Sequence, residues 1–198
     1  MPGSGGIALE LKRSIRSGSR SAVVDDPKQA QALLEFSLEA HRNDIRASGD
    51  PFFNHPYEVA LIVAREIPLD DVSVVSALLH DVAEDTDYEI KDIRQEFGDT
   101  IAEIVDGATK ITDIFRSHEI TQAESYRKML LSMVNDIRVM LVKFADRLHN
   151  MRTLEYLAAD KRVRMARETL DIYAPFAHRF GLAKIKWGRR RALVYIAQ

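Results

Sequence analysis

Residues 77–86 of this chain read ALLHDVAEDT, and the interpretation of the fold starts from this stretch. Its apolar first part predicts the end of a buried helix, where His80 and Asp81 place an imidazole and a carboxylate. A buried carboxylate costs on the order of several kcal/mol unless it is paired or bound to a metal ion. Glu84 lies three or four positions further on, so one helical turn returns it to the same face. The stretch therefore predicts a helix that ends at an ion-paired or ion-binding position.

Apolar residues recur at helical spacing on both sides of this stretch. Asp70 is suited to capping a helix and Gly98 to ending one. No stretch alternates for long with a period of two and no internal repeat is visible, so we predict an all-α bundle of roughly eight to ten helices. Helices are expected from Pro27 through His41, from Pro56, from Asp70 to Leu79, and over residues 90–97, 101–109, 122–134, 137–157, 161–173 and 185–196. Residues 85–87, 112–120 and a short segment from Pro175 are expected to connect them, with 112–120 mobile.

The composition excludes several classes of protein. The 198 residues carry a formal net charge of −2, 46% of them are hydrophobic, and none is cysteine. This length and hydrophobic share suit one folded domain, and the longest apolar runs are far short of the roughly 20 residues that span a membrane. Without cysteine there is no disulfide, thiolate metal site or thiol nucleophile. A pI of about 6.3 argues against a general nucleic-acid-binding surface but allows a small anionic ligand.

Residues 1–26 differ in composition from the rest of the chain. They combine several arginines and serines, and Glu10 is the only acidic residue before Asp25. We expect a flexible basic amino-terminal segment, with a targeting (transit) segment as the alternative. Residues 27–198 are expected to form the folded domain.

Further polar residues join His80 and Asp81 as candidate ligands. His55 follows a loop, and Asp146 lies within an apolar helical stretch. Two imidazoles and two carboxylates form a mixed nitrogen and oxygen set, which suits Mn²⁺, Fe²⁺, Zn²⁺ or Co²⁺ better than Ca²⁺. Taken singly, each has an ordinary interpretation: a hydrogen-bonded helix end, an ion-pair partner, or a packing histidine. Arg46, taken singly, is a surface charge.

Several motifs in order along the chain resemble one family. The His55, His80-Asp81 and Asp146 pattern resembles that of HD-domain metal-dependent phosphohydrolases. The closer resemblance is to the hydrolase domain of the RelA/SpoT-homologue family, which contains long bifunctional Rel/SpoT enzymes and small alarmone hydrolases. The motifs that carry it are residues 77–86, 96–98, 105–110, 143–154 and 168–181. The resemblance covers about residues 28–187.

The resemblance implies an HD-domain helical bundle and a specific reaction. The reaction is hydrolysis of the 3′-pyrophosphate of ppGpp and pppGpp, which gives GDP or GTP and pyrophosphate. One Mn²⁺ ion is the implied cofactor, and its implied ligands are His55, His80, Asp81 and Asp146. The implied partner is a small-molecule nucleotide in the cytoplasm, with neither a nucleic acid nor a membrane.

The resemblance also implies roles for residues around the metal ion. Glu84 and Asp85 match the acidic pair implicated in hydrolysis, which agrees with the need for a group that orients water or takes its proton. Arg46 is implied to lie against the guanine, and a planar cation is able to stack on a base. The other implied nucleotide contacts are Ser48, Asn150 and Thr153.

The sequence departs from the family at three places. Ala47 stands where the family often has a basic residue, Phe52 stands where it has tyrosine, and residues 188–191 read GRRR in place of an acidic sequence. Ala47 motivates an alternative substrate, such as an adenine alarmone or another 3′-phosphorylated nucleotide. A regulatory domain that binds an alarmone without hydrolysing it is a further alternative.

We expect no synthetase domain in this chain. Two interpretations stay open at this point: a standalone small hydrolase, and the amino-terminal piece of a longer Rel/SpoT enzyme. The oligomeric state is not readable from the sequence.

Overall fold

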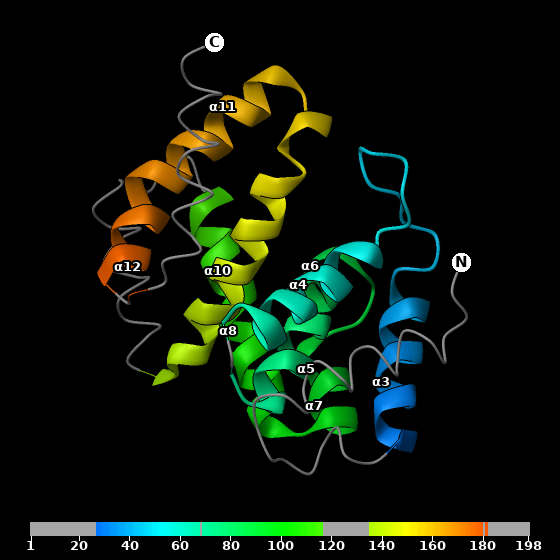
Figure 1. The fold of residues 1–198 in the computed structure, drawn as a ribbon. Coiled ribbons are helices and arrows are strands. Elements are labelled where there is room, and N and C mark those ends of the chain that lie inside the picture. Colours follow the sequence, from blue (N-terminus) through cyan, green and yellow to red (C-terminus); the bar gives the residue numbers. More distant parts are fainter. Residues whose placement is uncertain (1–26, 68, 117–134, 180, 182–198) are drawn as a thin grey trace.

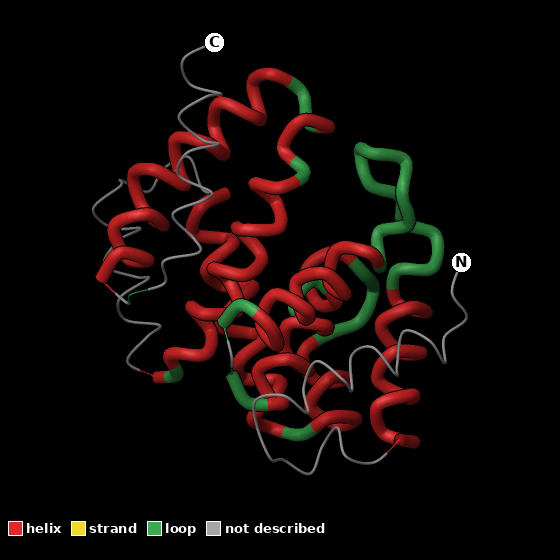
Figure 2. Tube along the Cα trace, viewed as in Figure 1, coloured by secondary structure: helices red, strands yellow, loops and turns green. Residues whose placement is uncertain are grey.

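The computed structural model describes residues 27–67, 69–116, 135–179 and 181, and within these ranges all regular structure is helical (Figures 1 and 2). An isolated bridge between Ile45 and Pro51 is the sole β-type pairing among these residues. The prediction of an all-α fold is confirmed. The expected amino-terminal segment and the expected helices over 122–134 and 185–196 lie outside the described residues. The predicted count of eight to ten helices includes these two helices.

The described helices follow one another along the chain (Figure 1). They are α3 (Pro27–Ala40), α4 (Asn54–Arg65), α5 (Asp71–Leu79), α6 (Val82–Asp85), α7 (Ile90–Phe97), α8 (Asp99–Arg116), α10 (Ile137–Arg152), α11 (Ala159–Glu168) and α12 (Ala174–Arg179). A 3₁₀ turn spans Leu154–Tyr156, and a π-helical turn spans Thr169–Tyr173. None of the described helices has the length and apolar character needed to cross a bilayer.

Helix α5 lies at the centre of the core. It packs against α3, α4, α8 and α10, while α8 also packs against α7 and α10. A helix enclosed in this way buries most of its side chains, and Val74, Val75, Ala77, Leu78 and Leu79 are each at most 1% exposed, as are Ser73 and Ser76. The carbonyl of Leu78 accepts a hydrogen bond from Ser37 Oγ at 3.0 Å, which satisfies a backbone group at the buried end of α5. The end of α5 is therefore held deep inside the molecule.

Asp70 caps α5, as predicted from the sequence. Its carboxylate accepts from Ser73 N at 2.9 Å, and it also pairs with Arg138 at 2.9 Å. Arg138 in turn pairs with Asp136 at 2.7 Å, so one guanidinium joins the starts of α5 and α10. Partial burial raises the pKa of Asp70, but the Ser73 and Arg138 hydrogen bonds outweigh it and lower the pKa. The Arg138 hydrogen bonds likewise lower the pKa of Asp136.

Helices α8 and α10 approach closely at Gly107. A Cβ atom at this position would lie 2.8 and 3.1 Å from the two γ-carbons of Val139, which is 3% exposed. The absence of a side chain at Gly107 thus sets the distance between these two helices.

Several helix boundaries differ from the sequence prediction. Residues 112–116 continue α8 instead of joining a mobile connection, because buried Ile111 extends the apolar face of the helix and Thr112 Oγ1 donates to Ala108 O. Residues 117–120 of that predicted connection lie outside the described residues. Helix α10 ends at Arg152, five residues before the predicted end, and a 3₁₀ turn follows.

Two prolines are tolerated inside helical segments. Helix α4 begins two residues before Pro56, which lies in the first turn, where a backbone N–H would have no helical partner. Pro175 was expected to start a non-helical segment, but it lies in α12 directly after the π-helical turn. The wider turn accommodates a residue that has no N–H to donate.

Asp85 was expected in a loop and is instead the last residue of α6.

Candidate metal centre

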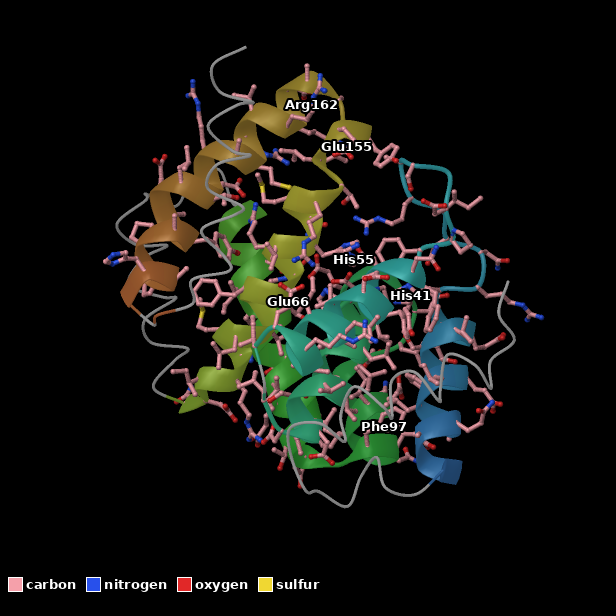
Figure 3. All side chains as sticks on the ribbon, viewed as in Figure 1. His41, His55, Glu66, Phe97, Glu155 and Arg162 are labelled. Carbon is pink, nitrogen blue, oxygen red and sulfur yellow. The ribbon has the colours of Figure 1, made fainter. Side chains whose placement is uncertain are left out.

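Four side chains from four helical elements converge at the buried end of α5. His55 lies in the first turn of α4, His80 is the C-cap of α5, Asp81 is the N-cap of α6, and Asp146 lies in the middle of α10. They are 3%, 1%, 7% and 8% exposed. Figure 3 shows His55 near the middle of the molecule, at the start of α4. The fold thus places together the residues that the sequence singled out as metal ligands.

Their ligand atoms face one another at short range. His55 Nε2 lies 3.2 Å from Asp81 Oδ2 and 3.3 Å from Asp146 Oδ1. His80 Nε2 lies 2.9 Å from Asp81 Oδ1 and 3.9 Å from Asp146 Oδ1. Ligands that share one ion, each about 2.1 Å from it, lie about 3–4 Å from one another. The ligand atoms of His55, His80 and Asp146 all lie within 4.8 Å of one another. Asp81 adjoins this group through its contact with His55.

The hydrogen bonds of His80 test whether a metal ion fits. Its Nδ1 lies 2.7 Å from Ala77 O, which only a protonated nitrogen can contact favourably. The buried Nε2 has no hydrogen-bond partner, although it faces the carboxylates. A histidine that ligates a metal ion has this arrangement: one nitrogen donates to a fixed acceptor and the other keeps its lone pair. Two imidazoles and two carboxylates therefore fit a borderline divalent cation.

Lys143 supplies the positive charge closest to the carboxylates. It is 4% exposed, and its Nζ lies 2.5 Å from Asp146 Oδ2. Although burial raises the pKa of both carboxyl groups, His80 beside Asp81 and Lys143 beside Asp146 hold each pKa well below its usual range. Both groups are therefore carboxylates at neutral pH, which is the form that binds a cation.

His149 belongs to this centre and was missed in the sequence analysis. Its Nδ1 lies 2.7 Å from Nδ1 of His55 and 3.3 Å from Nη1 of Arg46. Burial, followed by the neighbouring His55 and Arg46 side chains, lowers the pKa of His149 to about 3, so its ring is neutral. Its position three residues after Asp146 was the available signal, since such residues share a helix face.

The metal centre opens into a cleft of about 350 Å³, within the usual range for small-ligand sites. Half-buried Glu84 and exposed Asp85 line it on the α6 side. Lys143, Arg147 and Arg164 line it as well. The cleft thus combines carboxylates beside the metal centre with cations suited to phosphate groups.

Arg147 is fixed at the wall of this cleft by two neighbours. It lies over the ring of Tyr173 at 4.3 Å, and its Nη2 donates to Glu168 at 3.1 Å. Arg152, near the end of α10, instead pairs with Glu66 at 2.8 Å and does not line the cleft. The basic wall is therefore formed by the cations on the cleft side of α10 and α11.

A second lobe of about 270 Å³ adjoins the first and shares Arg46, Phe52, Asn150 and Met165 with it. The four predicted nucleotide contacts, Arg46, Ser48, Asn150 and Thr153, all line this lobe. Ser48 Oγ donates to Asp50 at 2.7 Å, and Arg46 Nη2 donates to Asn150 Oδ1 at 3.2 Å. The structure therefore brings these predicted residues together beside the metal centre.

The loop between α3 and α4 (Figure 1) carries Arg46 and Ser48, which both line this lobe. It closes through hydrogen bonds from Arg46 N to Asp50 O and from Phe52 N to Asp44 O, at 2.9 and 2.8 Å. Gly49 turns the chain with φ +87°, a conformation that favours glycine. Phe52, which lacks the tyrosine hydroxyl of the resembling family, lies 5.9 Å from the guanidinium of Arg46.

Comparison with known proteins gives one family match. The HD domain family model matches residues 34–183 of this chain. This range contains His55, His80, Asp81 and Asp146, which form the candidate centre.

Curated relatives cover most of this chain. A protein of Haemophilus influenzae named guanosine-3′,5′-bis(diphosphate) 3′-pyrophosphohydrolase is 52% identical over 149 residues, 75% of this chain and 22% of that protein. The bifunctional (p)ppGpp synthase/hydrolase SpoT of Escherichia coli is 48% identical over 163 residues, 82% of this chain and 23% of that protein. A GTP pyrophosphokinase of Streptomyces coelicolor is 44% identical over 177 residues, 89% of this chain and 21% of that protein. The chain thus spans about a fifth of the length of these relatives.

A solved structure supports the fold. It is that of a metazoan ortholog of SpoT, described as hydrolysing ppGpp, with a TM-score of 0.62 and 23% sequence identity. The match covers 81% of this chain and 91% of that one. At this identity the likeness shows a shared fold. Together with the relatives, it confirms the resemblance found in the sequence.

Proposed function

Since this chain belongs to the HD-domain family, we propose that it hydrolyses the 3′-pyrophosphate of ppGpp and pppGpp to GDP or GTP and pyrophosphate. The observation that carries the proposal is the buried group of His55, His80 and Asp146 at the base of a cleft that has both acidic and basic walls. The names of the relatives support the choice of substrate. Such a substrate is a cytoplasmic small molecule, so we propose a cytoplasmic location.

The proposed cofactor is one Mn²⁺ ion held by His55, His80, Asp81 and Asp146. A bound divalent ion would supply charge that stabilises phosphoryl oxygens and would lower the pKa of water. The choice of Mn²⁺ over other borderline ions rests on the family resemblance. Metal analysis of the purified protein tests it, since another predominant ion would contradict this choice.

Glu84 and Asp85 are proposed as the residues that handle the attacking water. Glu84 reaches the cleft beside the metal centre from a half-buried position, where a carboxylate can orient a water molecule or accept its proton. Asp85 is exposed at the edge of the same cleft, so its proposed role is to assist Glu84 and to pass the proton to solvent.

The remaining residues bind the nucleotide in this proposal. Lys143, Arg147 and Arg164 face the phosphates, because they line the lobe that contains the metal centre. The base would lie in the adjoining lobe, where the guanidinium of Arg46 can stack on it. Ser48, Asn150 and Thr153 line that lobe and supply polar contacts.

The test is to incubate the purified protein with ppGpp and Mn²⁺ and to measure GDP and pyrophosphate. Loss of a metal ligand in His80→Ala or Asp81→Ala should reduce turnover by more than the roughly 10–100-fold typical of residues that only support a ligand. His178→Ala, which changes an exposed histidine on α12, is the matched control. Full turnover by either ligand variant would contradict the mechanism.

A second substrate class is favoured by one observation. Ala47 lines the proposed base lobe at a position where the resembling family often has a basic residue. A panel of guanine and adenine alarmones, with another 3′-phosphorylated nucleotide, distinguishes these substrates. Binding of an alarmone without turnover in that panel would instead support a regulatory domain.

A further inference from the structure

Two hydrogen-bonded paths run from the guanidinium of Arg46 to two of the proposed metal ligands. On one path, Nη1 of Arg46 lies 3.3 Å from Nδ1 of His149, which lies 2.7 Å from Nδ1 of His55. On the other path, Nη2 donates to Asn150 Oδ1 at 3.2 Å, and Asn150 Nδ2 donates to Asp146 Oδ1 at 2.5 Å. Arg46 thus contacts the neighbours of two ligands while remaining outside the metal centre.

The first path has only one consistent assignment of protons. A guanidinium has donors and no acceptor, so Nδ1 of His149 must accept and carries no proton. The contact between the two histidines then requires Nδ1 of His55 to donate. With its proton on Nδ1, neutral His55 has its lone pair on Nε2, the atom that faces Asp81 and Asp146. This is the tautomer in which His55 can bind a metal ion through Nε2.

We propose that His149 is a positioning residue of the metal centre, fixed as an acceptor by Arg46 and holding His55 in its metal-binding tautomer and orientation. The inference rests on the metal site of the proposed function. His149 acts only through His55, because it contacts the nitrogen of His55 that points away from the carboxylates.

The experiment measures Mn²⁺ affinity by calorimetry without any nucleotide. His149→Phe keeps a ring but loses the acceptor, and it should weaken Mn²⁺ binding by about 10–100-fold, the usual effect of removing a group that supports a metal ligand. His149→Asn carries an amide oxygen close to the position of Nδ1, so it should restore most of the affinity. Exposed His178→Phe is the matched control and should bind as the wild type does.

A second variant tests the same path from its outer end. Arg46→Met removes the donor that fixes His149, in a half-buried loop residue whose change leaves the core intact. It should weaken Mn²⁺ binding in the wild-type background and have a smaller effect in the His149→Phe background, because residues on one path are not additive. Absorption spectra of the Co²⁺-loaded variants should shift in parallel with the affinities.

The outcomes separate this inference from the proposed function. If the wild type binds Mn²⁺ and folded His149→Phe binds it equally tightly, the positioning role is refuted while the proposed hydrolase stands. If His149→Phe does not fold, unchanged Mn²⁺ affinity in Arg46→Met refutes the role instead. If the wild type binds no divalent ion, the metal site fails, and both proposals fail with it.

Discussion

Replacing Lys143 by methionine should destabilise the metal-free protein strongly. The ammonium of Lys143 lies 2.5 Å from the Asp146 carboxylate, and the two residues are 4% and 8% exposed. Removing one partner of such a buried pair leaves an uncompensated charge and costs about 3–5 kcal/mol. In a domain of this size each kcal/mol corresponds to about 2–4 °C, so the melting temperature should fall by about 6–20 °C. Methionine keeps the length of the side chain, so the loss reports on charge rather than on volume.

A divalent ion should offset this loss. The ion would supply to Asp146 the positive charge that the variant lacks, and removal of a neighbouring cation should strengthen its binding. Thermal unfolding in EDTA and in saturating Mn²⁺ measures both effects, because a ligand that binds only the folded state raises its stability by about 2.7 kcal/mol at a hundred times Kd. The increase in melting temperature with Mn²⁺ should be larger in Lys143→Met than in the wild type.

Lys110→Met is the matched control. Its ammonium also lies 2.5 Å from a carboxylate, that of Asp106, but Lys110 is exposed. Such a pair contributes less than about 1 kcal/mol. A metal-free Lys143→Met protein that melts within the range of this control would refute the argument that the buried pair stabilises the centre.

Three further predictions concern the scaffold. Gly107→Ala should lower the free energy of unfolding by about 1–2 kcal/mol, because its Cβ would meet Val139 at 2.8 Å, and chemical denaturation should show no loss in a Val139→Ala background. Arg138→Ala should lower the free energy of unfolding by about 1 kcal/mol, because it removes the cation that pairs with both Asp70 and Asp136. The pKa values of Asp70 and Asp136 lie below the ordinary value of 3.8. Pairing of these carboxylates with Arg138 therefore stabilises the fold above about pH 4, and this stabilisation is lost as the pH falls through the lowered pKa values. In acid titrations the difference between wild type and Arg138→Ala should therefore shrink below about pH 4, and a constant difference would contradict this.

The sequence predicted most of the candidate centre because its members carry local signals. His80 and Asp81 stand out at the end of an apolar helix, and Asp146 interrupts an apolar stretch. A charge at a core position is visible without coordinates, since burial of an unpaired charge is costly. His149 carried only the weaker signal of its helical spacing from Asp146, because a histidine on a helix face is ordinary until its neighbours are known.

Helix boundaries were predicted less well where tertiary contacts override local chemistry. Residues 112–116 stay helical because buried Ile111 extends the apolar face of α8. Pro175 lies in a helix because a π-helical turn precedes it. Neither effect is written in the local pattern of prolines and apolar residues.

The sequence by itself determined the helical class, the buried end of α5 and the residue types of the candidate metal centre, because periodicity and the cost of burying charge act locally. Only the tertiary structure decided which atoms face one another. It placed His55 beside His149, which is 94 residues further along the chain, and Arg46 against both His149 and Asn150. Hydrogen bonds require their atoms within about 3 Å. The packing of α4 against α10 brings His55 and His149 that close, and the loop before α4 brings Arg46 to α10.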